Sequence, residues 1–391
     1  MNKKGILVVG AGFAGAVVAR KLAENTDKNI LIIDKRNHLA GNCHTDIDEE
    51  TGVMVHKYGA HIFHTSNLEV WNFIQSFGEF MPFINRPKAV TESGIYNLPI
   101  NLQTINQFFG KKFSPKDAEA FIATKAKSEI QNPKNFEEQA LKFMGEELYQ
   151  TFFYGYTKKH WGCEPSELPA SILKRLPLRF SYNDNYYRSI YQGIPVDGYT
   201  KIVERMLDHE QIHIKLNEAW DTSMKDEFEH VFFTGALDLF YDYQYGELSY
   251  RTLKWEIERG HGDLQGHPGL NYPGLDVEFT RRREHKHYEY WKEHDKSIIF
   301  TEYSSEANIK SGDELYYPKR LTHDKTRLND YLDLAEKEES VSFIGRLGTY
   351  RYLDMHKVIE ESLIISDNWL KAYSQGTEYP KGTFQRAVQS G

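Results

Sequence analysis

Three histidines, His56, His61 and His64, lie within the ten-residue stretch HKYGAHIFHT. Imidazole side chains so spaced can bind a metal ion, exchange protons with a substrate or fill a core. If the stretch is a strand, side chains three positions apart point to opposite faces, which argues against one metal ion shared by His61 and His64. The chain has only two cysteines, far apart and in no CxxC pattern. We therefore expect neither a metal site in this stretch nor a structural zinc site.

A glycine motif near the N-terminus indicates a second kind of chemistry, the binding of a dinucleotide. The motif has GxGxxG spacing and comprises Gly10, Gly12 and Gly15. It lies between an apolar strand at 6–9 and a helix that begins near Phe13, whose N-terminal amides would favour a pyrophosphate. The three glycines would permit a tight turn, a close backbone approach to the ligand and close helix packing. Asp34 ends the next apolar strand, where its carboxylate can accept from a ribose hydroxyl.

The segment after Asp34 bears on whether the dinucleotide is FAD or NAD. Arg36 and Gly41 are spaced as in FAD proteins of the glutathione-reductase type, although Ala40 interrupts the usual pair of glycines. Asn42 follows directly, and we expect it to contact the same cofactor. From these residues alone, the choice between FAD and NAD stays open.

A late segment, 343–363, adds a second set of candidate cofactor contacts. An apolar strand ends near Arg346, and a helix begins near Asp354 and Met355. The amides and the positive dipole end of such a helix can face a flavin and stabilise its anionic reduced form. The alternative is a plain C-terminal helix with Asp354 as its N-cap.

The composition limits the function classes. The chain has 391 residues with 56 acidic and 48 basic side chains, a formal net charge of -8, and no basic stripe. A nucleic-acid partner is therefore not expected. The apolar run after the N-terminal lysines is too short for a signal peptide or a membrane span, so we expect a cytoplasmic protein with no membrane insertion.

The pattern of elements predicts an α/β protein with several parts. A strand, a helix and a strand at the N-terminus predict a Rossmann-like dinucleotide-binding domain. We expect this domain to be discontinuous and to comprise residues 1–84, 200–240 and 338–391. The segments between its parts are expected to form a hairpin at 85–100, a helical insert at 101–180, a strand within 181–199 and an antiparallel β-sheet domain at 241–337.

Several long motifs are similar to those of bacterial UDP-galactopyranose mutases over nearly the whole chain. They include YGAHIFHT, LPINLQTINQFF, FFYGYTKKHWG, DNYYRSIYQGIP, LDVEFTRRREHKHY and IGRLGTYRYLDM. The resemblance implies an FAD enzyme that interconverts UDP-galactopyranose and UDP-galactofuranose by attack of reduced flavin N5 on the anomeric carbon, without net redox change. It also implies a homodimer, an external reductant such as NAD(P)H, and supply of galactofuranose for a cell-surface polysaccharide.

The same resemblance assigns roles to individual residues. It implies that Arg175, on a closing loop near 168–178, and Arg281 opposite it bind the diphosphate, and that His61 lies near flavin and sugar. Further substrate contacts are implied for Asn85, Phe152, Tyr156, Trp161, Tyr186, Tyr317 and Tyr352. Without the resemblance, the aromatic residues at helical spacing would be read as core, and most arginines as solvated. The roles of His56 and His64 stay open.

Two rival functions remain at this point. The sequence departs from common family residues at Ala60, His160, Ala236 and Phe279. Because a few contacts around a hexose decide which analogue fits, a mutase for dTDP-fucopyranose or UDP-N-acetylgalactosamine is one rival. The other is a flavin oxidoreductase of the amine-oxidase type, which would share the glycine motif but has no need of the arginine and tyrosine set.

Overall fold

The computed structural model describes residues 4–175, 178–319, 321 and 324–377. Its first sheet has five parallel strands in the order β10-β2-β1-β11-β17. The strands are β1 (Lys4–Val9), β2 (Ile30–Asp34), β10 (Ile212–Leu216), β11 (Phe228–Phe233) and β17 (Val341–Phe343). Strand β1 lies at the centre, so the predicted Rossmann-like unit at the N-terminus is confirmed and is completed by distant segments.

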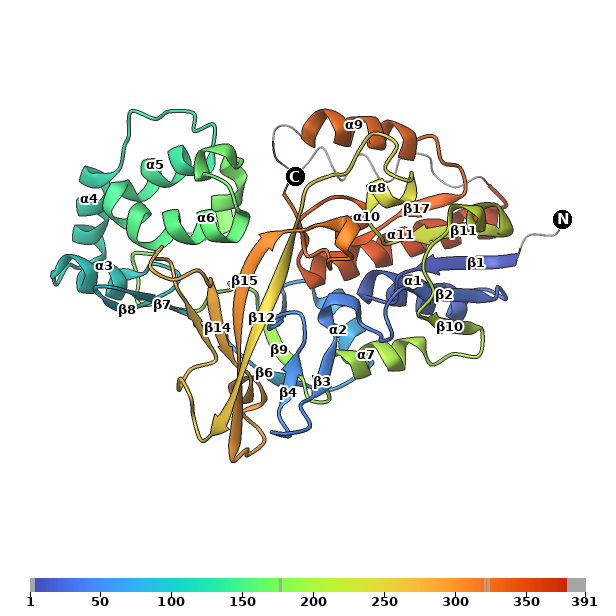
Figure 1. The fold of residues 1–391 in the computed structure, drawn as a ribbon, viewed down its shortest axis with the longest axis horizontal. Helices are drawn as coiled ribbons and strands as arrows, with labels where there is room; N and C mark the ends of the chain where they lie inside the picture. The colour runs from blue at the N-terminus through green and yellow to red at the C-terminus, as the bar shows by residue number, and fades with distance from the viewer. Residues whose placement is uncertain (1–3, 176–177, 320, 322–323, 378–391) are drawn as a thin grey trace.

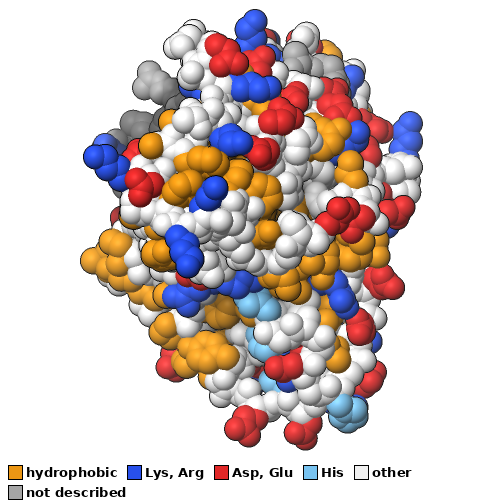
Figure 2. Space-filling model, turned by 90° about the vertical axis from the view of Figure 1, so that its left-hand side faces the viewer, with side chains coloured by type: hydrophobic (Ala, Val, Ile, Leu, Met, Phe, Trp, Pro, Cys, Tyr) orange, Lys and Arg blue, Asp and Glu red, His pale blue; other side chains and the backbone are white. Residues whose placement is uncertain are grey.

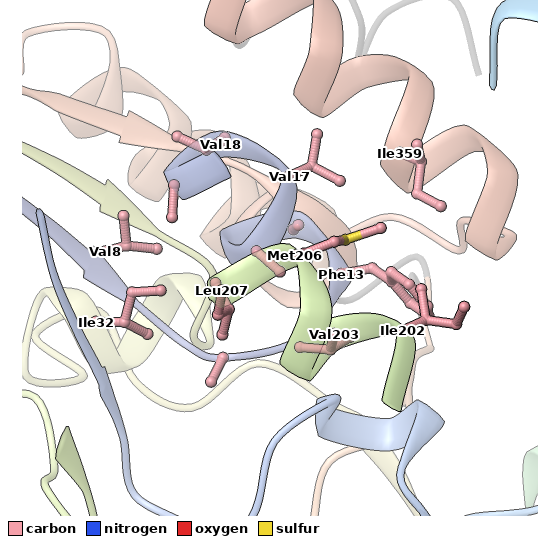
Figure 3. Close-up of a cluster of buried hydrophobic side chains, with 14 of the residues drawn as sticks. Val8, Phe13, Val17, Val18, Ile32, Ile202, Val203, Met206, Leu207 and Ile359 are labelled. Carbon is pink, nitrogen blue, oxygen red and sulfur yellow. The ribbon is translucent and has the colours of Figure 1, made fainter. Parts of the chain in front are cut away.

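Side chains of β1 alternate between the two faces of this sheet. Ile6 and Val8 belong to the core under α1 (Phe13–Asn25), α7 (Gly198–Leu207) and α11 (Met355–Gln375). Figure 3 shows part of this core, in which Val17 and Met206 lie between Val8 on the sheet and Ile359 on α11. Leu7 and Val9 belong to the opposite core, which includes residues of α8 (Leu237–Phe240) and α9 (Asp324–Ala335). Apolar side chains on both faces are what a covered parallel sheet requires.

Helices occupy one end of the molecule (Figure 1). They are α3 (Leu102–Phe109), α4 (Pro115–Lys125), α5 (Phe136–Tyr149), the π-helix η2 (Gln150–Tyr154) and α6 (Gly155–Trp161). Gly145 kinks α5 with φ 76°, and a Cβ there would lie 2.4 Å from the Lys125 carbonyl oxygen. The π-helix η2 then leads directly into α6. The regular α-helical hydrogen bonding is therefore interrupted just before α6.

A seven-stranded sheet lies between the helical end and the parallel sheet (Figure 1). Its long antiparallel strands are β12 (Tyr250–His261) and β15 (Lys296–Glu306), and β14 (Arg281–Glu284) pairs with β15. The remaining strands are β13 (Gly269–Asn271), β16 (Tyr317–Pro318), β7 (Lys88–Thr91) and β8 (Gly94–Asn97). The hairpin predicted within 85–100 is confirmed by the pairing of β7 with β8.

The strand expected within 181–199 belongs to a different sheet. It is β9 (Tyr191–Pro195), which pairs with β5 (Phe63–Thr65) and β6 (Phe80–Pro82). Strand β5 is short, so His64 lies on it whereas His61 precedes it. The condition that one strand carries both histidines is therefore not met, because the chain around Gly59, with φ 99°, turns before β5 begins.

Shorter elements connect these layers. They are β3 (Thr45–Ile47), β4 (Met54–His56), α2 (Leu68–Gln75), α10 (Gly345–Gly348) and the 3-10 turns η1 (Gly41–Cys43), η3 (Pro165–Glu167), η4 (Ala170–Arg175), η5 (Thr222–Glu227), η6 (His285–Glu289) and η7 (Ile309–Ser311). Within the described ranges, none of the helices combines the length and the apolar character needed to cross a bilayer.

Candidate functional site

The motif glycines have steric reasons for being glycine. Gly10 has φ 106°, and a Cβ there would lie 1.9 Å from Oγ1 of Thr234. A Cβ at Gly15 would lie 2.1 Å from the Gly10 carbonyl oxygen, so α1 packs directly on the turn. Gly12 is the N-cap of α1, and no side chain caps that helix. Its first amides therefore remain available for an anionic ligand, and Phe13 begins the helix as predicted.

Asp34 hydrogen-bonds to the backbone of the glycine turn. Its carboxylate accepts from the Ala11 amide at 2.8 Å and from the Arg36 amide at 2.9 Å. These bonds tie the end of β2 to the glycine turn at the end of β1. A carboxylate has further lone pairs, so acceptance from a ribose hydroxyl remains a prediction.

Residues 36–42 lie against the glycine turn. The Cβ of a residue at Gly41 would lie 3.3 Å from the Gly12 Cα, and Ala40 has φ 70°, the left-handed region that glycine favours. Ala40 thus adopts a conformation normally left to glycine. Arg36 pairs with Glu314, donates to Asn42 and lies 4.6 Å from the centre of the Tyr58 ring.

The late segment reaches the same place. Gly345 has φ 75°, and a Cβ there would lie 3.2 Å from the Ala14 Cβ of α1. Arg346 donates to the carbonyl oxygens of Leu353, at 2.7 Å, and Tyr316, at 3.1 Å, and so fixes the approach to α11. Asp354 occupies the N-cap position of α11, but its side chain makes no capping hydrogen bond. Met355 is the first residue of that helix.

His64 meets residues of α11 that the sequence analysis did not connect with it. One ligand atom each of His64, Asp354 and His356 lies within 4.8 Å of the others, a spacing that could hold a metal ion. The His64 ring also stacks on Tyr187, with ring centres 3.6 Å apart, and its Nδ1 contacts Ser189 Oγ at 3.0 Å. Asp354 and His356 lie in a distant part of the sequence, so the spacing of the histidines at 56–64 does not indicate this cluster.

Arg281 presents a partly free guanidinium. Its Nε donates to Glu302 Oε1 at 2.7 Å, and Thr280 Oγ1 donates to the same oxygen at 2.6 Å. Burial is the largest single influence and opposes ionisation of Glu302, but Arg281, His160 and the Thr280 hydroxyl together outweigh it, so the pKa of Glu302 is lowered. Among the described residues, none hydrogen-bonds to the two terminal nitrogens of Arg281. They form a fork suited to a phosphate or carboxylate.

Aromatic rings form a wall beside this arginine. The rings of Tyr317 and Tyr352 stack at 5.4 Å with an angle of 17°, and the Arg346 guanidinium lies over both, at 5.3 and 5.1 Å from their centres. Trp161 lies 6.5 and 6.4 Å from the same two rings. Residues predicted from three distant motifs are thereby brought together.

Helix α6 extends the wall through a residue that the sequence analysis noted only as a departure. His160 stacks on Tyr156 at 5.7 Å and lies 5.3 Å from the centre of Tyr317. Burial lowers the pKa of His160 to about 3, and Arg281 acts in the same direction. His160 is therefore a neutral ring between predicted substrate contacts.

Tyrosine hydroxyls supply uncharged donors. Burial raises the pKa of Tyr156 to about 12 and also raises the pKa of Tyr186, so both keep their protons. Within the part of the chain that the structure describes, the hydroxyls of Tyr156, Tyr186 and Tyr317 have no hydrogen-bond partner. The Tyr186 amide donates to the Asn85 carbonyl oxygen at 2.8 Å, which places these two predicted contacts side by side.

His61 lies between the two halves of the site. Burial lowers its pKa to about 4, with Arg346 and Arg281 acting in the same direction, so the ring is neutral at physiological pH. Its Nδ1 is buried, and no described residue satisfies it. The His61 amide donates to Nδ1 of His56, which is fully buried and contacts His285. His56 thus belongs to the core, whereas His61 keeps a buried ring nitrogen for which a contact with flavin or sugar remains a prediction.

Two predicted substrate contacts are not brought into this arrangement. Phe152 is 5% exposed and packs edge-on against Tyr96 and Phe108, which favours the alternative of a core residue. Arg175 ends η4, and its side chain lies outside the described residues. Its predicted role on a closing loop therefore stays a prediction.

Glu302 is the main residue that the sequence analysis missed. It lies on β15, and register pairs it with Arg281 on β14. A carboxylate inside the apolar run IIFTEY is the only available signal, and that signal does not identify its partner. The register that places Glu302 opposite Arg281 had to be seen in the structure.

Comparison with known proteins gives a consistent result. The model of the UDP-galactopyranose mutase family matches residues 151–352, and that of NAD(P)-binding Rossmann-like domains matches residues 8–77. The chain is 50% identical to a probable UDP-galactopyranose mutase of Klebsiella pneumoniae, over 97% of this chain and 98% of that protein. It is 47% identical to the dTDP-fucopyranose mutase of Escherichia coli, over 95% of this chain and 99% of that one.

A solved structure shares the fold. The crystal structure of a reduced UDP-galactopyranose mutase superposes with a TM-score of 0.73 at 15% identity, over 99% of this chain and 98% of that one. The dinucleotide-binding prediction and the expected α/β architecture are confirmed by these matches. On the strength of the family model and of the extent of the sequence identity, the chain belongs to the UDP-galactopyranose mutase family of isomerases.

Proposed function

We propose that the chain is an FAD-dependent mutase that interconverts UDP-galactopyranose and UDP-galactofuranose without net redox change. One observation carries the proposal most directly. The free fork of Arg281 lies among neutral tyrosine hydroxyls and aromatic rings, in a chain that also has a glycine turn suited to a dinucleotide. A nucleoside diphosphate sugar needs a cationic fork, uncharged donors and a flat surface for its base.

The residues present fit FAD. No side chain caps the start of α1 at Gly12, so backbone amides there are available for a pyrophosphate. Close packing at Gly10, Gly15 and Gly41 keeps side chains away from these amides. We propose that the further contacts come from Phe13, Asp34, Arg36, Asn42, His61, Arg346, Tyr352, Asp354 and Met355. When bound and reduced, FAD supplies the nucleophile that attacks the anomeric carbon, so no nucleophilic protein side chain is needed.

The protein side chains then have three tasks. Arg281, joined by Arg175, neutralises the diphosphate as it leaves the anomeric carbon and holds it for return. Tyr156, Tyr186 and Tyr317 donate to phosphate oxygens without adding charge. His61, neutral because of burial and two arginines, offers a hydrogen bond to the sugar or the flavin rather than a charge.

The identity of the sugar is a separate question, because relatives named for two different sugars match this chain almost equally. Identities of 50% and 47% accompany names that specify UDP-galactopyranose and dTDP-fucopyranose. We favour UDP-galactopyranose because the family model that matches 151–352 carries that name. The alternatives are dTDP-fucopyranose and UDP-N-acetylgalactosamine, and less favoured is an amine-oxidase-type oxidation.

The decisive experiment uses the purified FAD-loaded protein, reduced under anaerobic conditions. Three substrates are supplied separately at equal concentration: UDP-galactofuranose and the furanose forms of dTDP-fucose and of UDP-N-acetylgalactosamine. The pyranose product of each is followed by chromatography. We expect many turnovers per reduced flavin and the highest kcat/KM with the galactose nucleotide. A higher kcat/KM with another nucleotide would assign that sugar, and one flavin reoxidised per substrate consumed would support oxidoreductase chemistry instead.

The proposal extends to the cellular setting implied by the resemblance. We infer a cytoplasmic homodimer that is reduced by NAD(P)H and supplies galactofuranose for a cell-surface polysaccharide. The face at the helical end carries hydrophobic patches between charged side chains (Figure 2), which supports self-association through the helical insert. Phe143 of α5, at 49% exposed, is one large apolar side chain of that insert.

A further inference from the structure

A lysine on α6 is enclosed by backbone carbonyl groups. Nζ of Lys159 donates toward four carbonyl oxygens, at 2.5 to 3.0 Å, which belong to Tyr272, Gly274, Val277 and Phe279. All four lie in the segment between β13 and β14. An ammonium group has three hydrogens, so four carbonyl acceptors are enough to satisfy all of its donors.

This lysine links two parts of the proposed substrate pocket. Helix α6 carries Tyr156 and Trp161 of the aromatic wall. The enclosed segment leads directly into Thr280 and Arg281, the two residues that share Glu302. Lys159 therefore joins the nucleotide-side helix to the start of the diphosphate-side strand.

Close backbone packing supports the same connection. A Cβ at Gly155, the first residue of α6, would lie 2.4 Å from the Pro273 carbonyl oxygen. The Tyr272 amide donates to the Thr280 carbonyl oxygen at 2.9 Å, which closes the segment into a loop around Nζ. Burial lowers the pKa of Lys159 to about 8, and the nearby carboxylate of Asp276, in the same loop, acts in the opposite direction.

We propose that Lys159 is a positioning residue that sets the spacing between the aromatic wall of α6 and the guanidinium of Arg281, and so matches the pocket to the length of a nucleoside diphosphate. The inference rests on the proposed function, because it concerns the length of the nucleoside diphosphate that the same pocket would accept. Lys159 touches neither Arg281 nor a substrate directly. It acts through the carbonyl loop at 272–279.

The test compares Lys159→Ala with Lys158→Ala in the FAD-loaded enzyme. Lys158 is adjacent in sequence but pairs with Glu164 on the surface, so it is a matched control. Because hydrogen bonds to a charged group are lost, we expect KM for the nucleotide sugar to rise about ten-fold or more in Lys159→Ala, with a smaller change in kcat and no change in the control. Propylammonium, which replaces the deleted atoms, should restore KM in Lys159→Ala alone.

A second readout separates this inference from the proposed function. Hydrogen exchange of amides 272–280 should become faster in Lys159→Ala and in Lys159→Met, and should not change in Lys158→Ala, whichever reaction the enzyme catalyses. Unchanged exchange and an unchanged KM in the Lys159 variants would overturn the inference. Inactivity of the wild type with every nucleotide sugar, combined with faster exchange in the variants, would overturn only the proposed function.

Discussion

The glycine turn and the aromatic-arginine pocket are built in opposite ways. The turn consists of backbone groups from segments close in sequence, 10–15 and 34–42, and side chains are excluded from it by contacts of about 2 Å at Gly10 and Gly15. The pocket consists of side chains from α6, β14 and the regions around Tyr186, Tyr317 and Tyr352. The turn therefore tolerates no added atoms at Gly10 and Gly15, whereas the pocket can be altered one functional group at a time.

The largest effect on folding and FAD content is expected from a substitution in the glycine turn. Gly15→Ala places a Cβ against the Gly10 carbonyl oxygen, so α1 must move away from β1. We expect the variant to yield little folded protein and to contain no FAD, as measured by the ratio of flavin to protein after purification.

A matched control for that variant is Gly110→Ala. Gly110 ends α3 with φ 62° and has open space around its Cβ position. The substitution should therefore destabilise the protein by about 1 kcal/mol, through backbone strain alone. Gly110→Ala should keep FAD. A Gly15→Ala protein with normal FAD content would contradict the steric reading of the turn.

The same contrast explains how much the sequence could reveal. The glycine motif, β2 with Asp34 and the helix at Met355 were all predictable, because the residue types within each segment indicate it. The partnership of Arg281 with Glu302 was not, since it depends on the register of β14 and β15. Phe152 shows the converse, because family position favoured a ligand contact whereas its packing with Tyr96 and Phe108 favours the core.

The next effect in size is expected from Glu302→Gln. This change keeps the shape of the side chain but removes the charge that orients Arg281 and pairs with it. Because a charge-assisted hydrogen bond becomes a neutral one, we expect kcat/KM to fall about ten-fold with FAD content unchanged. Steady-state kinetics with the nucleotide sugar provide the measurement.

Glu258→Gln is the appropriate comparison for this variant. Glu258 is an exposed carboxylate that pairs with Arg282, the neighbour of Arg281. The pair is on the surface, so its loss should change kcat/KM little. Equal losses in the two variants would show that the fork of Arg281 is not the feature that Glu302 protects.

A smaller effect is expected from Tyr317→Phe, which removes a hydroxyl and keeps the ring that stacks on Tyr352. Loss of one neutral hydrogen bond should raise KM by about three- to ten-fold. Tyr182→Phe, at an exposed position, serves as control. A KM that stays at the wild-type value would mean that the Tyr317 hydroxyl does not reach the substrate.

The smallest expected effect in the pocket is that of pH. Since the pKa values of His61 and His160 are lowered to about 4 and about 3, both rings stay neutral between pH 5 and 8. Binding of a nucleotide sugar, whose diphosphate diester does not titrate there, should show no step near 6.5. A step that disappears in His61→Gln would contradict a neutral His61.

Protein stability should nevertheless depend on pH. An unfolded histidine titrates near its ordinary value of 6.5, so between pH 6.5 and 4 the unfolded chain binds protons that the folded chain excludes at these positions. The free energy of unfolding should therefore fall as pH decreases through that window. Denaturant unfolding at pH 7.5 and 5.5 measures the difference.

The central claim is that the glycine turn binds the cofactor and that a separate pocket binds the diphosphate. Its most direct test measures FAD content and kcat/KM on the same sample of Arg281→Ala. We expect unchanged FAD content and a loss of about 100-fold or more in kcat/KM, because the fork that neutralises the leaving diphosphate is gone. Arg281→Lys, which keeps a positive charge beside Glu302, should retain a normal fold and remain impaired. The separation of the two sites would be contradicted by near-normal kcat/KM in Arg281→Ala, or by loss of FAD from both variants.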